Sequence, residues 1–290
     1  MEVKTWSTPA KAEDCRSIPC PLCGYAGTFT KALDCSSWFY VRCPRCGLVH
    51  INPQPLVQEI HNRYAGNSYL NYEKANEDNF LNLQHLGLRD GGFYDIFSDG
   101  KGGLKRGLSL LDIGCATGAL VGELAALGWE ASGLELSAEE AAWGRSLGRN
   151  ILEGTIEGAL ADGRLGPAQF DVVLASHVIE HLNQPALFVQ NVYQIVKPGG
   201  YFFITTPNID GFQAKLFGKK WRSAIFDHIC LFSKANLRKI LENTGWTIEK
   251  TATWGGLAKG TAPDWLKKMA DNGAKRFGFG DVVLMRCKKN

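Results

Sequence analysis

The chain has 290 residues and a formal net charge of +3. That length allows one large α/β domain and a small additional unit. The modest charge, without a long basic run, gives no reason to expect a nucleic-acid partner. No stretch approaches the length needed to cross a bilayer. Residues 1–6 lack the apolar core of a signal peptide, so we expect a cytoplasmic protein whose cysteines are thiols or metal ligands rather than disulfides.

Two C-P-x-C-G knuckles follow an N-terminal tail at 1–16. They contain Cys20, Cys23, Cys43 and Cys46. Each knuckle turns two thiolates toward one point, and two knuckles at this spacing give the four-sulfur coordination of a zinc ribbon. A segment as short as 17–50 cannot bury its own core, so bound zinc would supply the folding energy. Four thiolates leave no open coordination position, which favours a structural zinc over a catalytic one.

Residues 51–105 form a helical lead-in segment. Pro53 and Pro55 stiffen its beginning, and the pattern of 56–90 predicts helix. Predicted strands and helices alternate after it. The strands are 108–113, 131–136, 150–153, 170–175, 200–206, 246–253 and 281–287, and the helices are 118–127, 138–147, 185–196 and 233–244. Such alternation is typical of an α/β fold with a doubly wound, mostly parallel sheet.

A glycine-rich turn joins the first core strand to its helix. The turn reads Asp112-Ile113-Gly114-Cys115-Ala116-Thr117-Gly118. Its glycines allow sharp bending and the close approach of a ligand. Glu135 ends the second strand, where an acidic side chain in a Rossmann-like fold binds ribose hydroxyls. These features predict a nucleoside-containing cofactor, although the spacing differs from the G-x-G-x-x-G of dinucleotide sites.

The turn resembles the first motif of the class I S-adenosylmethionine-dependent methyltransferases, with Ala116 in place of the middle glycine. Residues 170–176 resemble their fourth strand, and 178–182 and 197–200 resemble segments that follow it in one large subgroup. Four motifs in the correct order favour this family over an NAD-binding or purely structural Rossmann unit. The resemblance implies a Rossmann-like methyltransferase domain over 106–290, S-adenosylmethionine as cofactor and an antiparallel last strand.

We expect the cofactor at the carboxyl ends of the strands, with Glu135 on its ribose and Ile156, or a neighbour within 154–157, near its adenine. The expected cofactor-binding residues are Asp112, Gly114, Cys115, Gly118, Glu135, Leu136, Thr155, Ile156, Ser176 and His177. Two inserts, 208–227 and 255–278, also follow strand ends. They would line the acceptor pocket, cap the domain, or do both.

Four side chains near the expected pocket are candidate general bases, namely His177, Glu180, His181 and His228. Related quinone-pathway O-methyltransferases carry Glu-x-x-Glu-His at 177–181, and a divalent cation is attributed to that cluster; His177 replaces its first Glu.

Residues 226–233 resemble a segment of zinc-ribbon sugar methyltransferases in which Tyr-x-Glu-His supplies the acid–base residues. Asp227 and His228 match its last two positions, whereas Ile225 stands at the tyrosine. We predict that His228 is the base, that Asp227 orients it, and that His181 is the second candidate. Bracing of the cap is the alternative role for this pair.

The combination of ribbon and core implies methyl transfer to a small molecule, namely a sugar, a nucleotide-sugar or a related biosynthetic intermediate. The alternative is an rRNA or tRNA methyltransferase that uses the ribbon for RNA contact. The small net charge disfavours it, because only Arg42 and Arg45 are prominent on the ribbon. The intact glycine turn and Glu135 disfavour a non-catalytic binding module. The acceptor atom and the oligomeric state stay open at this stage.

Overall fold

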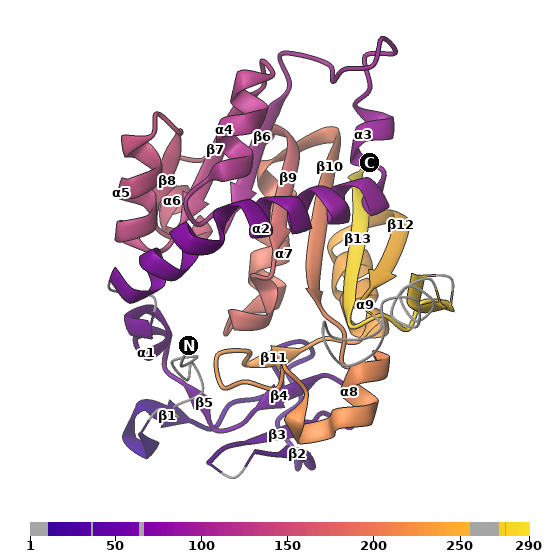
Figure 1. Cartoon of the computed structure of the whole chain (residues 1–290). Coiled ribbons are helices and arrows are strands. Elements are labelled where there is room, and N and C mark those ends of the chain that lie inside the picture. The colour runs from indigo at the N-terminus through magenta and orange to yellow at the C-terminus, as the bar shows by residue number, and fades with distance from the viewer. Residues whose placement is uncertain (1–10, 36, 64–66, 256–272, 276) are drawn as a thin grey trace.

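The computed structural model describes residues 11–35, 37–63, 67–255, 273–275 and 277–290. A seven-stranded sheet forms its centre (Figure 1). The strands lie in the order β12 (Trp246–Trp254), β13 (Val282–Lys289), β10 (Val196–Pro207), β9 (Phe170–Ser176), β6 (Ser109–Ile113), β7 (Glu130–Glu135) and β8 (Ile151–Glu153). β13 runs antiparallel to β10 and β12, and the other neighbouring pairs are parallel. The predicted sheet with its antiparallel last strand is confirmed.

Helices cover both faces of the sheet. One face packs against α6 (Ile156–Ala161), α7 (Pro185–Ile195) and α9 (Lys234–Thr244). The other face packs against α2 (Asn67–Gly91), α3 (Phe93–Ile96), α4 (Ala119–Ala126) and α5 (Ala138–Ser146). All five residues of β6 are buried, as expected for a central strand covered on both faces.

The lead-in segment forms α1 (Val57–Arg63), α2 and α3. α2 runs across the sheet from α5 toward β12 and β13 (Figure 1). Two of its glycines permit close packing: a Cβ would lie 3.3 Å from a Trp254 ring atom at Gly87, and 3.0 Å from Leu284 Cδ2 at Gly91. α2 therefore sits directly on the strands and beside the glycine turn.

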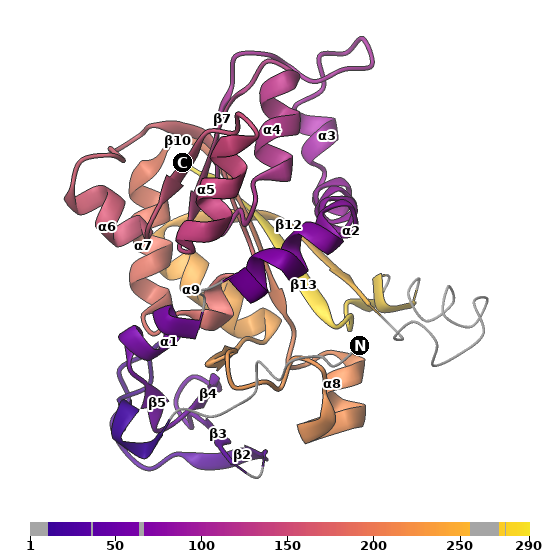
Figure 2. The ribbon, with the colours of Figure 1, turned by 60° about the vertical axis from the view of Figure 1, so that its left-hand side comes forward.

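The N-terminal unit lies at the carboxyl ends of the parallel strands (Figures 1 and 2). β2 (Thr30–Asp34), β3 (Phe39–Arg42) and β4 (Val49–Ile51) form an antiparallel sheet. β11 (Cys230–Leu231), from the far end of the chain, adds to it beside β4. β1 (Cys15–Arg16) pairs separately with β5 (Gln54–Pro55). One continuous cluster of buried side chains extends from Tyr40 and Leu48 in this unit to Ile204 in the main sheet.

The insert at 208–227 contains α8 (Phe212–Phe217). Most of the predicted insert at 255–278, and residues 1–10 of the predicted tail, lie outside the described residues. Within the part of the chain that is described, no helix is both long and apolar enough to cross a membrane.

Candidate active site

The glycine turn between β6 and α4 has the backbone that its sequence predicts. Gly114 has a φ of 71° and Gly118 a φ of 75°, conformations that favour glycine. A Cβ at either residue would lie 2.6 Å from a neighbouring side chain, that of Val178 or Ile151 respectively. Ala116, which replaces the middle glycine, also has a positive φ, of 50°. The turn is therefore a tight backbone loop in which Val178 and Ile151 pack directly against the two glycines.

Glu135 lies at the end of β7 and is buried. Its two carboxylate oxygens accept hydrogen bonds from the backbone N–H groups of Ser137 and Ala116, each at 2.9 Å. Burial raises the pKa of Glu135 despite these bonds. Each carboxylate oxygen can accept a second hydrogen bond. The carboxylate is thus fixed against the glycine turn with capacity left for ribose hydroxyls.

Asp112, the last residue but one of β6, is also buried. Its Oδ2 accepts a long hydrogen bond of 3.4 Å from Gln84 Nε2 of α2. Its Oδ1 has no hydrogen-bond partner among the described residues. Burial raises the pKa of Asp112 to about 7. A buried carboxylate oxygen without a donor is costly, and the ammonium group of S-adenosylmethionine would supply one.

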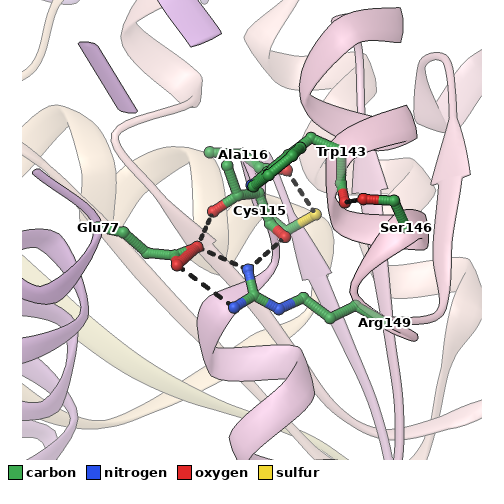
Figure 3. A network of polar contacts seen from close by, with 7 residues as sticks. Glu77, Cys115, Ala116, Trp143, Ser146 and Arg149 are labelled. Atoms are coloured by element: carbon green, nitrogen blue, oxygen red, sulfur yellow. Dashed lines mark hydrogen bonds and ion pairs between the residues drawn. The ribbon is translucent and has the colours of Figure 1, made fainter. Parts of the chain in front are cut away.

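A network of hydrogen bonds and an ion pair joins α2 to the glycine turn (Figure 3). Arg149 Nη1 lies 2.6 Å from Glu77 Oε1 and donates to the Thr117 carbonyl at 2.8 Å. The Thr117 hydroxyl donates to the same Glu77 oxygen at 2.5 Å. The hydrogen bond from Arg149 lowers the pKa of Glu77. Glu77 and Arg149 were not predicted, because no motif connects positions 72 residues apart.

The other expected cofactor residues lie along the same strand ends. Cys115 is a buried thiol in the turn, Leu136 follows Glu135 directly, and Ile156 is buried at the start of α6. Thr155 caps α6, because its hydroxyl accepts from Gly158 N at 3.1 Å. Ser176 ends β9, and His177 follows it with a φ of 56°.

Glu180 lies in a 3-10 turn (Ile179–His181) that follows β9, and it is fully buried. Its Oε1 is 3.0 Å from His177 Nδ1, and its Oε2 accepts from the Thr206 hydroxyl at 2.9 Å. Burial raises its pKa, but the His177 hydrogen bond and the neighbouring histidines outweigh burial and lower the pKa to about 2. Glu180 is therefore an ionised carboxylate.

His181 and His228 pack edge to face with their ring centroids 4.8 Å apart. His181 Nδ1 lies 2.8 Å from the Asp227 carbonyl, and His228 Nδ1 lies 2.9 Å from the Ser223 carbonyl. A carbonyl only accepts hydrogen bonds, so each Nδ1 carries a proton and Nε2 is the ring nitrogen left to meet a ligand. Burial lowers the pKa of His228 to about 3, which keeps this imidazole neutral.

One ligand atom each from Glu180, His181 and His228 lies within 4.8 Å of the others. This is a set of two histidines and a carboxylate, which suits a divalent transition metal. The cluster differs from the one expected from 177–181 alone, because His228 joins it and His177 is on its edge. The His177 side chain is 47% exposed and contacts the cluster through Glu180.

The expected role of Asp227 is wrong in one respect. Its carboxylate does not orient His228; it accepts from Arg63 Nη1 of α1 at 2.8 Å. The Ser223 carbonyl holds His228 instead. The Arg63 guanidinium also lies over the Phe226 ring, 4.7 Å from its centroid. Neither Arg63 nor Ser223 was predicted, since Arg63 is 164 residues away and a backbone carbonyl leaves no sequence signal.

The four knuckle cysteines converge as predicted. Cys20 Sγ lies 3.5 Å from Cys46 Sγ, Cys23 Sγ lies 3.6 Å from Cys43 Sγ, and all four sulfurs are within 4.8 Å of one another. Zinc–sulfur bonds of about 2.3 Å in a tetrahedron place sulfurs roughly 3.8 Å apart. The donor set and its spacing fit a four-thiolate zinc site.

The profile of a family described as "Methyltransferase domain" matches residues 89–251, more than half of the chain. The ubiquinone biosynthesis O-methyltransferase of Caulobacter vibrioides is 39% identical over 108 residues, which are 35% of this chain and 42% of that protein. The mitochondrial enzyme of the same description from Rattus norvegicus is 37% identical over 108 residues, 35% of this chain and 31% of that protein. The chain thus spans less than half the length of these two curated relatives.

Two solved structures share the fold. A SAM-dependent methyltransferase from Archaeoglobus fulgidus has a TM-score of 0.51 at 18% identity, covering 71% of this chain and 94% of that one. A possible histamine N-methyltransferase from Thermotoga maritima has a TM-score of 0.50 at 20% identity, covering 73% of this chain and 95% of that one. At these identities the likeness concerns the fold alone.

Proposed function

We propose that this chain, which belongs to the class I S-adenosylmethionine-dependent methyltransferases, transfers a methyl group to a small-molecule acceptor beside His228. S-adenosylmethionine supplies that group on a sulfonium sulfur, where it is already activated. The protein then has to align the two reactants and take up a proton. The observation that supports this most is that the glycine turn follows β6 and His181 follows the neighbouring strand β9, so that the His181–His228 pair lies at the same end of the sheet as the glycine turn.

Two buried carboxylates would hold the cofactor, because each can still accept a hydrogen bond beyond those made with the described residues. Asp112 Oδ1, which has no donor, would accept from the ammonium group. Glu135, fixed by two backbone N–H groups, would accept from the ribose hydroxyls. Zinc at the four knuckle cysteines would be structural, since four thiolates complete its coordination.

We assign the general base to His228. Its Nδ1–H is held by the Ser223 carbonyl, so Nε2 is the atom that takes the proton from the acceptor. As the acceptor's bond to hydrogen breaks, its electron pair bonds to the methyl carbon, and the carbon–sulfur pair returns to sulfur. Burial opposes protonation of His228, and the ionised Glu180 nearby stabilises the imidazolium that forms. His181, whose ring centroid lies 4.8 Å from that of His228, is the alternative base.

The same cluster has a second use, in which a divalent metal ion polarises the acceptor. One ring nitrogen from each histidine and a carboxylate oxygen converge there, and each imidazole is oriented by a backbone carbonyl, as is usual for histidine metal ligands. In that case the metal rather than His228 would lower the pKa of the acceptor hydroxyl.

The acceptor class follows from two considerations. The resemblance to zinc-ribbon sugar methyltransferases favours a sugar or nucleotide-sugar. The relatives named for ubiquinone biosynthesis favour an aromatic hydroxyl. Both are small molecules with a hydroxyl whose proton must leave, which is what a base or a metal beside the methyl donor provides.

One experiment distinguishes three roles for His228: a general base, a ligand of a divalent metal ion, and a structural support of the insert at 208–227. Purified protein is screened for S-adenosylhomocysteine release with panels of nucleotide-sugars and catechols, before and after treatment with a chelator. We expect His228→Ala to lower turnover about a hundredfold with unchanged cofactor affinity. We expect no effect of a chelator under conditions in which elemental analysis still finds the ribbon zinc. His85→Ala is the matched control, since His85 contacts Tyr94 and Glu123 on the other face of the sheet.

Three results would contradict the assignment. Full turnover in His228→Ala with an inactive His181→Ala would move the base to His181. Loss of turnover on chelation while the ribbon zinc is retained, restored by a divalent ion, would favour the metal. A His228→Ala protein with lowered thermal stability but unchanged turnover at saturation would indicate a brace.

A further inference from the structure

The ribbon forms part of the backbone around His228. β11 pairs with β4 through Cys230↔His50 and Leu231↔Val49, and Ile51 N donates to the Ile229 carbonyl at 2.9 Å. Cys230 and Leu231, the two residues of β11, therefore belong to the ribbon sheet, in which β11 lies beside β4 (Figure 1). The position of His228 is thus set in part by the ribbon, whose Tyr40 lies 188 residues earlier in the chain.

Tyr40, on β3 of the ribbon, contacts the turn formed by residues 225–228, which we call the His228 turn. The side chain is fully buried. Its hydroxyl lies 2.6 Å from the Ile225 carbonyl and 3.0 Å from the His228 carbonyl. Both carbonyls only accept, so the hydroxyl is the donor that they share. Burial raises the pKa of Tyr40 well above its usual range, so the donor proton is retained at every pH at which the protein would be assayed.

The ring packing of this turn also comes from the N-terminal side. Trp38 of the ribbon meets Phe226 edge to face at 5.7 Å, and Arg63 covers the same ring. The turn itself has one internal bond, from His228 N to the Ile225 carbonyl at 3.1 Å. Side-chain packing restrains Phe226, whereas the hydrogen-bond donor to the His228 carbonyl among the described residues is the Tyr40 hydroxyl.

We propose that Tyr40 is a positioning residue for His228: its hydroxyl fixes the backbone carbonyl of His228, and so directs Nδ1 to the Ser223 carbonyl and Nε2 to the acceptor. The catalytic meaning of this assignment rests on the proposed function, in which His228 acts at the acceptor. Without the hydroxyl, two carbonyls lose a donor in a buried setting, and the imidazole loses its single tautomer. Turnover in Tyr40→Phe should then fall about tenfold or more, the value of one such buried hydrogen bond.

The direct test reads the His228 ring and needs no acceptor. The wild type and the Tyr40 variants, zinc-loaded and with ¹⁵N-labelled histidine, are compared by NMR. The His228 signals are assigned as those that disappear in His228→Gln. In the wild type we expect a protonated Nδ1 and an unprotonated Nε2. In Tyr40→Phe we expect a mixture of the two tautomers. Tyr25→Phe is the matched control, because Tyr25 is a ribbon tyrosine whose hydroxyl contacts Thr28, away from this turn.

A rescue variant keeps the test decisive if Tyr40→Phe does not fold. 4-Aminophenylalanine at position 40 keeps the ring and offers two N–H donors, one for each carbonyl, and should restore the wild-type His228 signals. Unchanged signals in a folded Tyr40→Phe would overturn the proposal. Altered signals in the folded 4-aminophenylalanine protein would overturn it too. Because neither result involves methyl transfer, failure here is distinguishable from failure of the proposed function.

Discussion

The affinity for S-adenosylmethionine should rise with pH below neutrality, because Asp112 has to lose its proton to bind the cofactor's ammonium group. In the cofactor-free protein, burial raises the pKa of Asp112 to about 7. Its Oδ1 has no partner among the described residues. An ammonium group bound to this carboxylate favours the ionised form. Binding is then coupled to proton release, and acid pH weakens it.

The size of the effect follows from the pKa. With a value of about 7, roughly half of Asp112 is ionised at pH 7 and roughly a thirtieth at pH 5.5. If only the ionised form binds, the dissociation constant should weaken about fifteenfold over this interval. An α-amino group has a pKa of about 7.7 to 8.0, so the ligand itself stays protonated throughout. Glu135, whose pKa burial also raises, adds in the same direction.

Titration calorimetry from pH 5.5 to pH 7, in two buffers of different ionisation enthalpy, measures both the affinity and the protons released. Asp112→Asn should bind more weakly at pH 7 and lose most of the pH dependence. Gln84→Leu, which removes the donor to Oδ2, should move the transition to higher pH. A wild-type affinity that is constant from pH 5.5 to pH 7 would refute the reasoning.

Three further changes have defined outcomes. Glu135→Ala should weaken cofactor affinity at least tenfold, because the Ala116 and Ser137 N–H groups also lose their acceptor; an unchanged dissociation constant in calorimetry would contradict this. Elemental analysis should find one zinc per chain, and Cys43→Ser should lose it, whereas a fully zinc-loaded Cys43→Ser would exclude the four-thiolate site. Glu140 is fully buried without a partner among the described residues, and burial raises its pKa to about 7. The Glu140 carboxyl ionises near pH 4.5 in the unfolded chain and only near pH 7 in the folded protein, so the folded state loses stability as the pH rises across that window. In denaturant unfolding, Glu140→Met should therefore raise the free energy of unfolding by up to about 3 kcal/mol at pH 8 and by little at pH 4. An equal gain at both pH values would show that ionisation of Glu140 is not the cause.

The cofactor half of the site could be predicted because its signals are local. The glycine turn and Glu135 lie within 24 positions of one another (112 to 135), and each side chain's place follows from where its strand ends. The alternation of strands and helices predicted the doubly wound, mostly parallel sheet, and the family resemblance implied its antiparallel last strand. The knuckle cysteines were equally accessible, since two thiolates in one turn can only converge.

The acceptor half depends on contacts that no local pattern encodes. Asp227 and His228 are adjacent in sequence, which suggested that one orients the other, yet the carboxylate turns to Arg63 and the imidazole to a backbone carbonyl. β11 has only two residues and no strand pattern of its own. It becomes a strand because β4 supplies an open edge beside it. Such pairings depend on tertiary structure, and a single sequence does not specify them.

The way in which the ribbon is used bears on the choice between acceptor classes. A ribbon that binds RNA needs an exposed, basic face. Here Tyr40 is buried against the His228 turn, β4 is paired on both edges, by β3 and β11, and Asn236 of α9 donates to the Cys46 carbonyl at 2.6 Å. The knuckles are therefore tied to the methyltransferase core itself. This arrangement favours a ribbon that shapes a small-molecule pocket over one that acts as an independent RNA-binding unit.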